Sequence, residues 1–225
     1  MTNKTELNRR KFLAAAGAGM AAMQITMPGS AFAQSYPGRP ISLVVMYSAG
    51  GGTDTIMRKL AEEMAAAQGW TISVDVNLRP KLAADLGAYT AAVSEIAQLA
   101  DWLKASDEDL ALLGYTEVNP EHASELAQHF PNASRIALTF GADGAYLQVD
   151  GASAQAPVPI VDVTDTVGAG DTFWGNTLAD WANINGDAAA RVTQTLKWAM
   201  QAAAINCTRA GCQPPSKAEV QRALG

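Results

Sequence analysis

Short β-branched runs alternate with long alanine-rich stretches along the chain, and this alternation constrains the possible folds more than any other feature. We expect strands at residues 41–47, 71–76 and 135–140, with helices at about 54–68 and 89–103. Strands that are separated by helices usually pair in parallel, and the helices then cover the faces of the sheet. The sequence therefore predicts an α/β fold with a layered, mostly parallel sheet flanked by helices.

The remaining expected elements are shorter strands and capped helices. Ser106 or Asp107 can cap a short helix that runs to Leu113. Ser216, with Glu219 three residues later, forms a capping box for the last helix. The other expected elements are strands at 145–150, 154–158 and 160–163, a turn at 141–144, and helices at 119–130, 169–184 and 187–207.

The composition excludes several classes of protein. The 225 residues include 16 Lys and Arg against 22 Asp and Glu, and this net charge of −6 argues against a nucleic-acid partner, which needs a basic surface. Apolar residues make up 48% of the chain, enough for a sizeable core and too many for a disordered protein. Cys207 and Cys212 are too few for a disulfide framework or a four-ligand zinc site.

Residues 1–33 have the pattern of a targeting segment. Arg9 and Arg10 precede an apolar run at 12–27, and small residues at 31–33 suit a signal peptidase. The apolar run is too short and too rich in alanine and glycine for a stable membrane span. We interpret this segment as a twin-arginine signal peptide, which implies export to the periplasm; an amphipathic or disordered N-terminus is the alternative.

A glycine triplet follows the first expected strand of the mature chain. Residues 50–52 lie just before the helix at 54–68, so backbone amides and the helix dipole can bind an anion there. The segments YPGRPI at 36–41 and AGGGTD at 49–54 resemble the start of mature Bug-type solute receptors of tripartite tricarboxylate transporters. In that family this loop helps to hold a ligand carboxylate. The resemblance implies a receptor-like strand, loop and helix at 34–70.

A second glycine-rich turn, at 165–171, carries most of the chemical information. Gly168 and Gly170 allow the backbone to approach a ligand, and the amides that follow stand at a helix start, where phosphate oxygens bind. Asp171 stands in the same turn, although a carboxylate repels a bound phosphate. Its presence is explained if it takes a proton from an attacking hydroxyl while the amides hold a transferring phosphoryl group. A glycine turn with an incidental aspartate is the alternative.

This turn is not an isolated match. The DTVGAGD run at 165–171 resembles the C-terminal signature of the ribokinase-like (PfkB-type) sugar kinases. Four other segments resemble motifs of this family in the family's order, and the first two of them are similar to motifs of its fructokinase and 2-keto-3-deoxygluconate kinase branches. The resemblance covers residues 71–225 and implies a ribokinase-like fold, incomplete because the N-terminal half of the family is not visible. The four segments are DVNLRP at 75–80, KASDED at 104–109, TFGADG at 139–144 and CTRAGCQ at 207–213.

The resemblance implies a role for each matching position. Asp171 would be the catalytic base, and the backbone amides of Ala169 and Gly170 would form an anion hole for the phosphoryl group. Arg79 would reach the sugar or a substrate carboxylate; pairing with a neighbouring acid is the alternative. The positions that would contact the phosphates of ATP are Thr139, Gly141, Gly144 and Gly168.

Two acidic positions match metal sites of the family. Asp109 would organise Mg²⁺ and its waters, since a carboxylate and substrate phosphates can share a partly hydrated ion. Asp165, together with carbonyl groups near Asn206, Arg209 and Gly211, matches the place where many members hold a potassium-like ion.

These observations predict a carbohydrate kinase that uses ATP, Mg²⁺ and K⁺ to phosphorylate a hydroxyl of a fructose-like sugar or a keto-deoxy sugar acid. Activity is expected to be impaired, because the sugar-binding half of the family is not visible. An exported solute-binding protein for a small carboxylate, or a non-functional fusion product, is the alternative. The kinase portion implies the cytoplasm, whereas the leader implies the periplasm. An exposed edge of the sheet would favour self-association.

Overall fold

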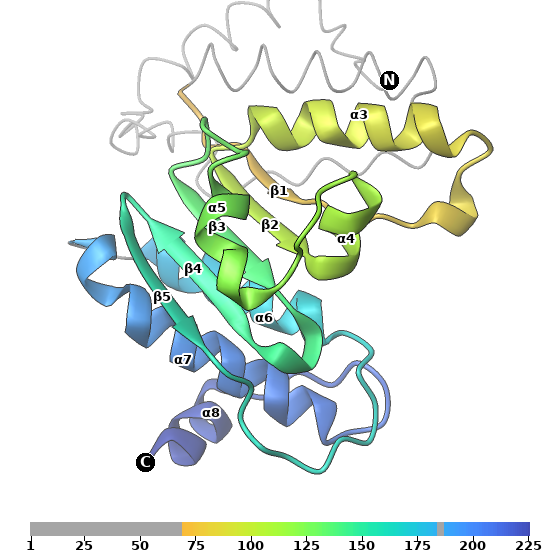
Figure 1. Cartoon of the computed structure of the whole chain (residues 1–225). Helices are drawn as coiled ribbons and strands as arrows, with labels where there is room; N and C mark the ends of the chain where they lie inside the picture. Colours follow the sequence, from red (N-terminus) through yellow and green to blue (C-terminus); the bar gives the residue numbers. More distant parts are fainter. Residues whose placement is uncertain (1–68, 184–186) are drawn as a thin grey trace, which may run out of the picture. The chain divides into compact units, whose positions relative to one another are not determined.

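The computed structural model describes residues 69–183 and 187–225 (Figure 1). The expected leader at 1–33, and all but the last two residues of the receptor-like segment at 34–70, lie outside this part of the chain. Both therefore stay predictions. All of the described residues belong to one compact unit.

The five described strands of the sheet are β1 (Ser73–Asp75), β2 (Trp102–Ser106), β3 (Arg135–Thr139), β4 (Ala145–Val149) and β5 (Ala152–Ala156). They lie in the order of the sequence, and only β4 runs against the other four. Asp150 and Gly151 form the turn between β4 and β5, with the positive φ angles of 48° and 88° that a two-residue hairpin turn requires. The expected α/β sheet, mostly parallel, is confirmed.

The helices of the described part are α3 (Leu86–Leu99), α4 (Asp107–Leu112), α5 (Ala123–Ala127), α6 (Ala169–Asn183), α7 (Ala188–Cys207) and α8 (Lys217–Leu224), with short 3₁₀ turns η1 (Pro80–Leu82), η2 (Pro120–His122) and η3 (Gly141–Asp143). None of them is long and apolar enough to cross a membrane.

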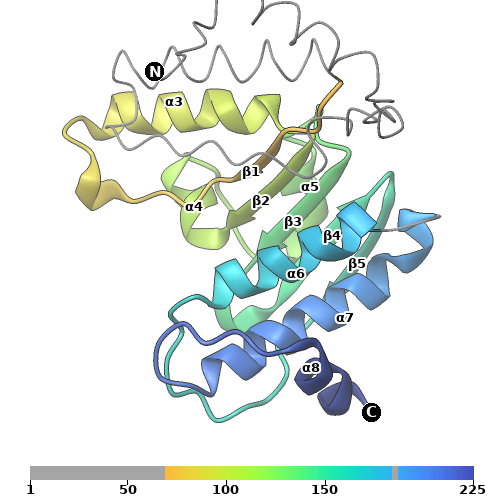
Figure 2. The ribbon, with the colours of Figure 1, turned by 180° about the vertical axis from the view of Figure 1, so that it is seen from behind.

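Helices cover both faces of the sheet, and each face has its own core (Figures 1 and 2). α3, α4 and α5 cover the face on which Leu103 of β2 is buried. α6 and α7 cover the opposite face, on which Ala137 and Leu147 are buried. Side chains alternate along a strand, so Lys104, next to Leu103, points to the face of α6 and α7.

One expected boundary is wrong. The helix expected at 89–103 is α3, which begins at Leu86 under an Asp85 cap and ends at Leu99. Trp102 and Leu103 belong instead to β2, which pairs with β1 on one edge and β3 on the other. Pairing on both edges and deep burial favour the strand, and neither can be read from so short an apolar run.

The strand expected at 160–163 is also absent from the structure. Residues 157–168 form a loop, in which the side chain of Ile160 is fully exposed. β-branched residues favour a strand only where they can pack against a neighbouring surface, and the sheet ends at β5. The helix expected at 119–130 is shorter than predicted, because η2 precedes α5 and the helix ends at Ala127.

The two long C-terminal helices are confirmed. α6 and α7 lie within one residue of the ranges expected at 169–184 and 187–207. The Asp187 side chain caps α7 by accepting hydrogen bonds from the amides of Ala189 and Ala190. The capping box predicted for the last helix is present at the start of α8.

Candidate active site

The carboxyl ends of the parallel strands bring the sequence motifs together. β1 ends at Asp75, β2 at Ser106 and β3 at Thr139. The register places Asp75 opposite Lys104 and Ser106 opposite Thr139. In sheets of this kind, ligands bind at this edge.

The turn at 165–171 leads directly into α6. Gly168 has φ of 77°, and a Cβ atom there would lie only 2.2 Å from Sγ of Cys212. Both facts require glycine at this position. The Ala169 amide donates to the carbonyl of Thr166 at 3.1 Å. Ala169, which was expected to contribute to an anion hole, therefore uses its amide within the turn.

The next two amides of the turn are open. Within residues 69–183 and 187–225, no hydrogen-bond acceptor meets the amides of Gly170 and Asp171. Unpaired amides at a helix start point along the positive end of the helix dipole and bind anions. These two amides, Gly170 as expected and Asp171 in addition, are therefore available to bind an anion, and their role in the site stays a prediction.

A buried ammonium group lies beside these amides. Nζ of Lys104 is 3.0 Å from a carboxylate oxygen of Asp75, and the lysine side chain is 5% exposed. A Cβ atom at Gly170 would lie 3.4 Å from the same Nζ. The ammonium group therefore lies in contact distance of the turn at Gly170, and Asp75 compensates its charge.

The carboxylates of the site interact electrostatically. Burial raises the pKa of the Asp75 carboxyl above its ordinary value, Lys104 opposes this shift, and Asp109 and Asp171 add to it. Asp171 is therefore close enough to Asp75 to repel it. The Asp171 side chain is exposed, and its carboxylate has no hydrogen-bond donor among the described residues. It is free to accept a proton from a ligand.

Asp109 is held in place by two amides. Its oxygens accept hydrogen bonds from the amides of Leu78 at 2.7 Å and Ser106 at 2.9 Å. The Ser106 hydroxyl accepts in turn from the Asp109 amide, which completes the capping box of α4. The described residues contain no group of three or more Asp, Glu, His or Cys that could hold a metal ion. Asp109 is buried and backbone amides occupy both of its carboxylate oxygens, so its expected role at a Mg²⁺ site stays a prediction.

Asp165 caps the turn that precedes α6. One of its oxygens accepts from the amide of Val167 at 3.0 Å and the other from the amide of Gly211 at 2.8 Å. These hydrogen bonds lower the pKa of the Asp165 carboxyl. The structure thus gives Asp165 a role in joining two loops, and its expected role at a K⁺ site stays a prediction.

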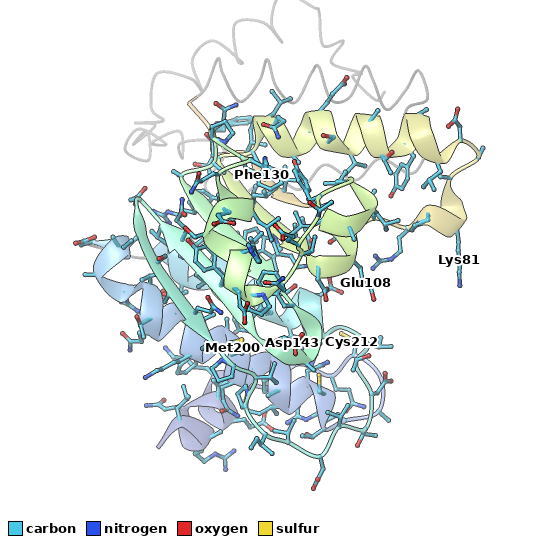
Figure 3. The ribbon with its side chains drawn as sticks, viewed as in Figure 1. Lys81, Glu108, Phe130, Asp143, Met200 and Cys212 are labelled. Carbon is cyan, nitrogen blue, oxygen red and sulfur yellow. The ribbon has the colours of Figure 1, made fainter. Side chains whose placement is uncertain are left out.

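The expected nucleotide turn at 139–144 lies at the same strand ends. A Cβ atom at Gly141 would lie 3.9 Å from a carboxylate oxygen of Asp107, the first residue of α4. Gly144 has φ of 117°, and a Cβ atom there would lie 2.3 Å from the carbonyl oxygen of Ala156. Figure 3 shows Glu108, Asp143 and Cys212, which mark α4, this turn and the 207–213 loop, toward the carboxyl ends of β2 and β3.

Arg79 follows the end of β1. Its guanidinium donates to the carbonyl of Leu78 at 2.9 Å, and its backbone amide donates to the hydroxyl of Tyr89 at 3.1 Å. No carboxylate of the described ranges pairs with it, so the alternative of a neighbouring acid is not observed there. Arg79 is exposed, and its expected contact with a substrate stays a prediction.

The side-chain contacts of three residues in or beside the quoted motifs were not predicted from the sequence. Lys104 and Asp75 form the buried pair described above, and the signal was a lysine within an apolar strand. Asn206 is fully buried in the last turn of α7 and holds the turn before α6. Its signal, an asparagine in the last turn of an alanine-rich helix, was weak.

One family of known proteins matches most of this chain. The model of the pfkB family of carbohydrate kinases matches residues 44–219. The chain belongs to this family. The match begins before residue 71, where the kinase resemblance was expected to start. The receptor resemblance at 34–70 is not supported by any of the comparisons.

Individual relatives are sugar kinases. A fructokinase of Vibrio alginolyticus is 30% identical over 173 residues, which are 73% of this chain and 54% of the relative. Aminoimidazole riboside kinase of Salmonella enterica, solved with aminoimidazole riboside and an ATP analogue, is 26% identical with a TM-score of 0.63, over 74% of this chain and 56% of that one. A fructokinase of Vibrio cholerae, solved with fructose, ADP and calcium, is 25% identical with a TM-score of 0.67, over 79% of this chain and 57% of that one. The chain spans about half the length of these relatives, and its fold is ribokinase-like.

Proposed function

We propose that the chain transfers the γ-phosphoryl group of ATP to a hydroxyl of a fructose-like sugar or a keto-deoxy sugar acid. The observation that supports this most strongly is the start of α6. There, two open amides and the Lys104 ammonium lie beside the free carboxylate of Asp171. An anion site that also holds a base is suited to phosphoryl transfer and poorly suited to passive binding of phosphate.

The roles of the residues follow from their chemistry. Asp171 takes the proton from the attacking hydroxyl as the new bond to phosphorus forms. The amides of Gly170 and Asp171 donate to the oxygens of the transferring group, where negative charge has to be stabilised. Lys104 adds positive charge beneath them without becoming exposed to water.

Metal ions would complete the site. Mg²⁺, when bound with ATP, would neutralise phosphate charge, and the family resemblance assigns Asp109 at the start of α4 to that ion. A K⁺ ion near Asp165 would bind through that carboxylate and nearby carbonyl groups. One solved relative binds ATP and Mg²⁺, and another binds fructose, ADP and potassium.

We propose a class of sugars as the phosphoryl acceptor, and not one compound. Relatives phosphorylate different sugars, since one is a fructokinase and another an aminoimidazole riboside kinase. We propose Arg79 as a substrate contact, because its guanidinium is free of acidic partners in the described part. A carboxylate-bearing sugar acid would gain more from this residue than fructose would.

The test separates nucleotide binding from turnover. Calorimetric titration with ATP and Mg²⁺ comes first, followed by a coupled assay of ADP release with fructose, other ketoses and keto-deoxy sugar acids. We expect nucleotide binding that depends on Mg²⁺, and ADP release that depends on sugar. Metal-independent binding of a dicarboxylate, with no nucleotide binding, would contradict the proposal and favour a solute-binding protein.

A further inference from the structure

The turn before α6 is joined to the 207–213 loop by several hydrogen bonds. The carbonyl of Cys207 accepts from the amide of Thr164 at 2.8 Å, and Asp165 accepts from the amide of Gly211 at 2.8 Å. Cys212 fills the space that a side chain at Gly168 would occupy. The loop therefore contacts this turn from Thr164 to Gly168, on the amino-terminal side of the two open amides.

Asn206 makes the most buried of these connections. Its side-chain amide donates to the carbonyl of Val167 at 2.8 Å, and its oxygen accepts from the amide of Gln213 at 2.8 Å. The residue is fully buried, so neither group can turn to water if its partner moves. Val167 directly precedes Gly168. A shift of Gln213 is thus transmitted by one rigid side chain to the anion-binding turn.

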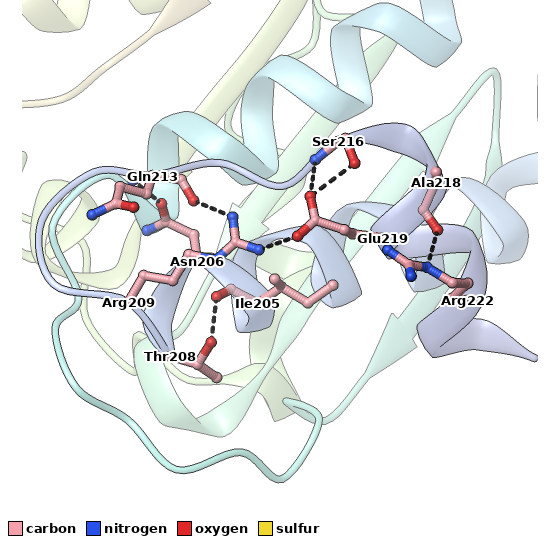
Figure 4. A network of polar contacts seen from close by, with 9 residues as sticks. All are labelled: Ile205, Asn206, Thr208, Arg209, Gln213, Ser216, Ala218, Glu219 and Arg222. Carbon is pink, nitrogen blue, oxygen red and sulfur yellow. Dashed lines mark hydrogen bonds and ion pairs between the residues drawn. The ribbon is translucent and has the colours of Figure 1, made fainter.

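The other end of the loop is held by an ion pair. Arg209 donates to the carbonyl of Gln213 at 3.0 Å and pairs with Glu219 of α8 (Figure 4). Glu219 also accepts from the amide and the hydroxyl of Ser216, both at 2.8 Å. The two hydrogen bonds from Ser216, and to a smaller extent the bond from Arg209, lower the pKa of Glu219 to about 2. The pair is therefore charged at neutral pH and fixes the loop to α8.

We propose that Arg209 and Asn206 are positioning residues for the phosphate-binding turn. Arg209 and Glu219 hold Gln213 in place, and Asn206 passes this constraint to Val167, so that the amides of Gly170 and Asp171 are ordered before a ligand arrives. This inference rests on the proposed function, because it treats the turn as the phosphate site. It adds that the last helix of the chain controls how well that site is formed.

The opposite end of α6 provides a matched control. There Arg191 of α7 pairs with Asp180 of α6 at 2.9 Å. Arg191 is the more exposed of the two arginines, at 46% against 27% for Arg209, and each pairs with one acid. Asp180 also accepts from the Thr195 hydroxyl, and none of these residues contacts the turn at 164–168.

The experiment measures amide hydrogen exchange of the full chain by mass spectrometry without a ligand, together with titration by ADP and Mg²⁺. In Arg209→Met, we expect exchange in a peptide spanning 164–172 to be about two to five times faster, the factor that a partly exposed ion pair contributes to local opening. Exchange in β3 should not change, which separates positioning from a general loss of stability. Affinity for ADP and Mg²⁺ should fall by a similar factor.

Two further variants keep the test decisive. Glu219→Gln retains an oxygen for the Ser216 cap but removes the charge, and it should accelerate exchange in the same peptide. Arg191→Met should leave that peptide unchanged. Unchanged exchange of 164–172 in both Arg209→Met and Glu219→Gln, or equal acceleration in Arg191→Met, would overturn the inference. If exchange responds as expected but the native chain binds no nucleotide, the positioning is supported and the proposed function fails.

Discussion

Two helices begin at the carboxyl edge of the sheet, and their first turns are built in opposite ways. At the start of α4, Ser106 and Asp109 satisfy each other's amides in a capping box. At the start of α6, the amides of Gly170 and Asp171 meet no acceptor in the described part of the chain. The first helix end is closed by its own side chains, whereas the second is left for a ligand.

The charged groups near the two helix starts also differ. The first turn of α4 carries three acidic residues, 107–109, which stabilise the positive end of the helix dipole. The start of α6 has the buried ammonium of Lys104 against Gly170, which is unfavourable next to the same dipole end. An anion at α6 would relieve this repulsion. A helix start that is suited to phosphate thus lacks the capping side chains that close the start of α4.

The largest expected effect concerns Asp171. In Asp171→Asn the side chain keeps its shape but is a very poor base, so sugar-dependent ADP release should fall by about 10²- to 10⁴-fold. Nucleotide affinity should stay the same or rise, because repulsion of the phosphates is removed. The matched variant at the other helix, Asp107→Asn, should keep most of its rate in the same coupled assay. A normal rate in Asp171→Asn would show that this residue is not the base.

The second prediction concerns the buried pair. Lys104→Met leaves the Asp75 carboxylate without its partner, and the free energy of unfolding in urea should fall by about 3 kcal/mol. The double variant with Asp75→Asn should recover most of this stability but not the affinity for ADP and Mg²⁺. If the double variant regained full affinity as well, the ammonium would have no part in anion binding.

The third prediction is smaller and applies to α4. Ser106→Ala removes the cap of a helix that has no ligand to replace it, so the protein should lose about 1 kcal/mol in urea denaturation. Calorimetry should give an almost unchanged affinity for ADP. A large loss of affinity, without a loss of stability, would mean that the start of α4 also binds phosphate directly.

The smallest expected effect concerns α8, whose start is closed by a capping box in the same way as that of α4. The pKa of Glu219 falls from 4.5 to about 2 on folding. The stabilisation from its charged form is therefore fully present above pH 4.5 and is lost as the pH falls toward 2. Thermal denaturation of Glu219→Gln should show a weaker dependence on pH in this window than the native chain. Equal slopes would contradict the assigned pKa.

The sequence predicted the elements whose signals are local. Asp187 marked the start of α7, and the Ser216 and Glu219 spacing marked that of α8, because capping depends on neighbouring residues. The glycine-rich turn before α6 was equally clear. Trp102 and Leu103 were assigned to a helix because their strand conformation depends on β1 and β3, which are distant in sequence. The pair of Lys104 and Asp75, and the two contacts of Asn206, were hidden for the same reason.

Backbone amide NMR of the full chain, titrated with ADP and Mg²⁺, tests the central claim most directly. We predict that the resonances of Gly170 and Asp171 shift together, more than those of the capped amides of Ser106 and Asp109, and saturate at the concentration found by calorimetry. Nucleotide binding without any shift at Gly170 and Asp171, or with the main shifts at the start of α4, would contradict the assignment of the α6 start as the phosphate site.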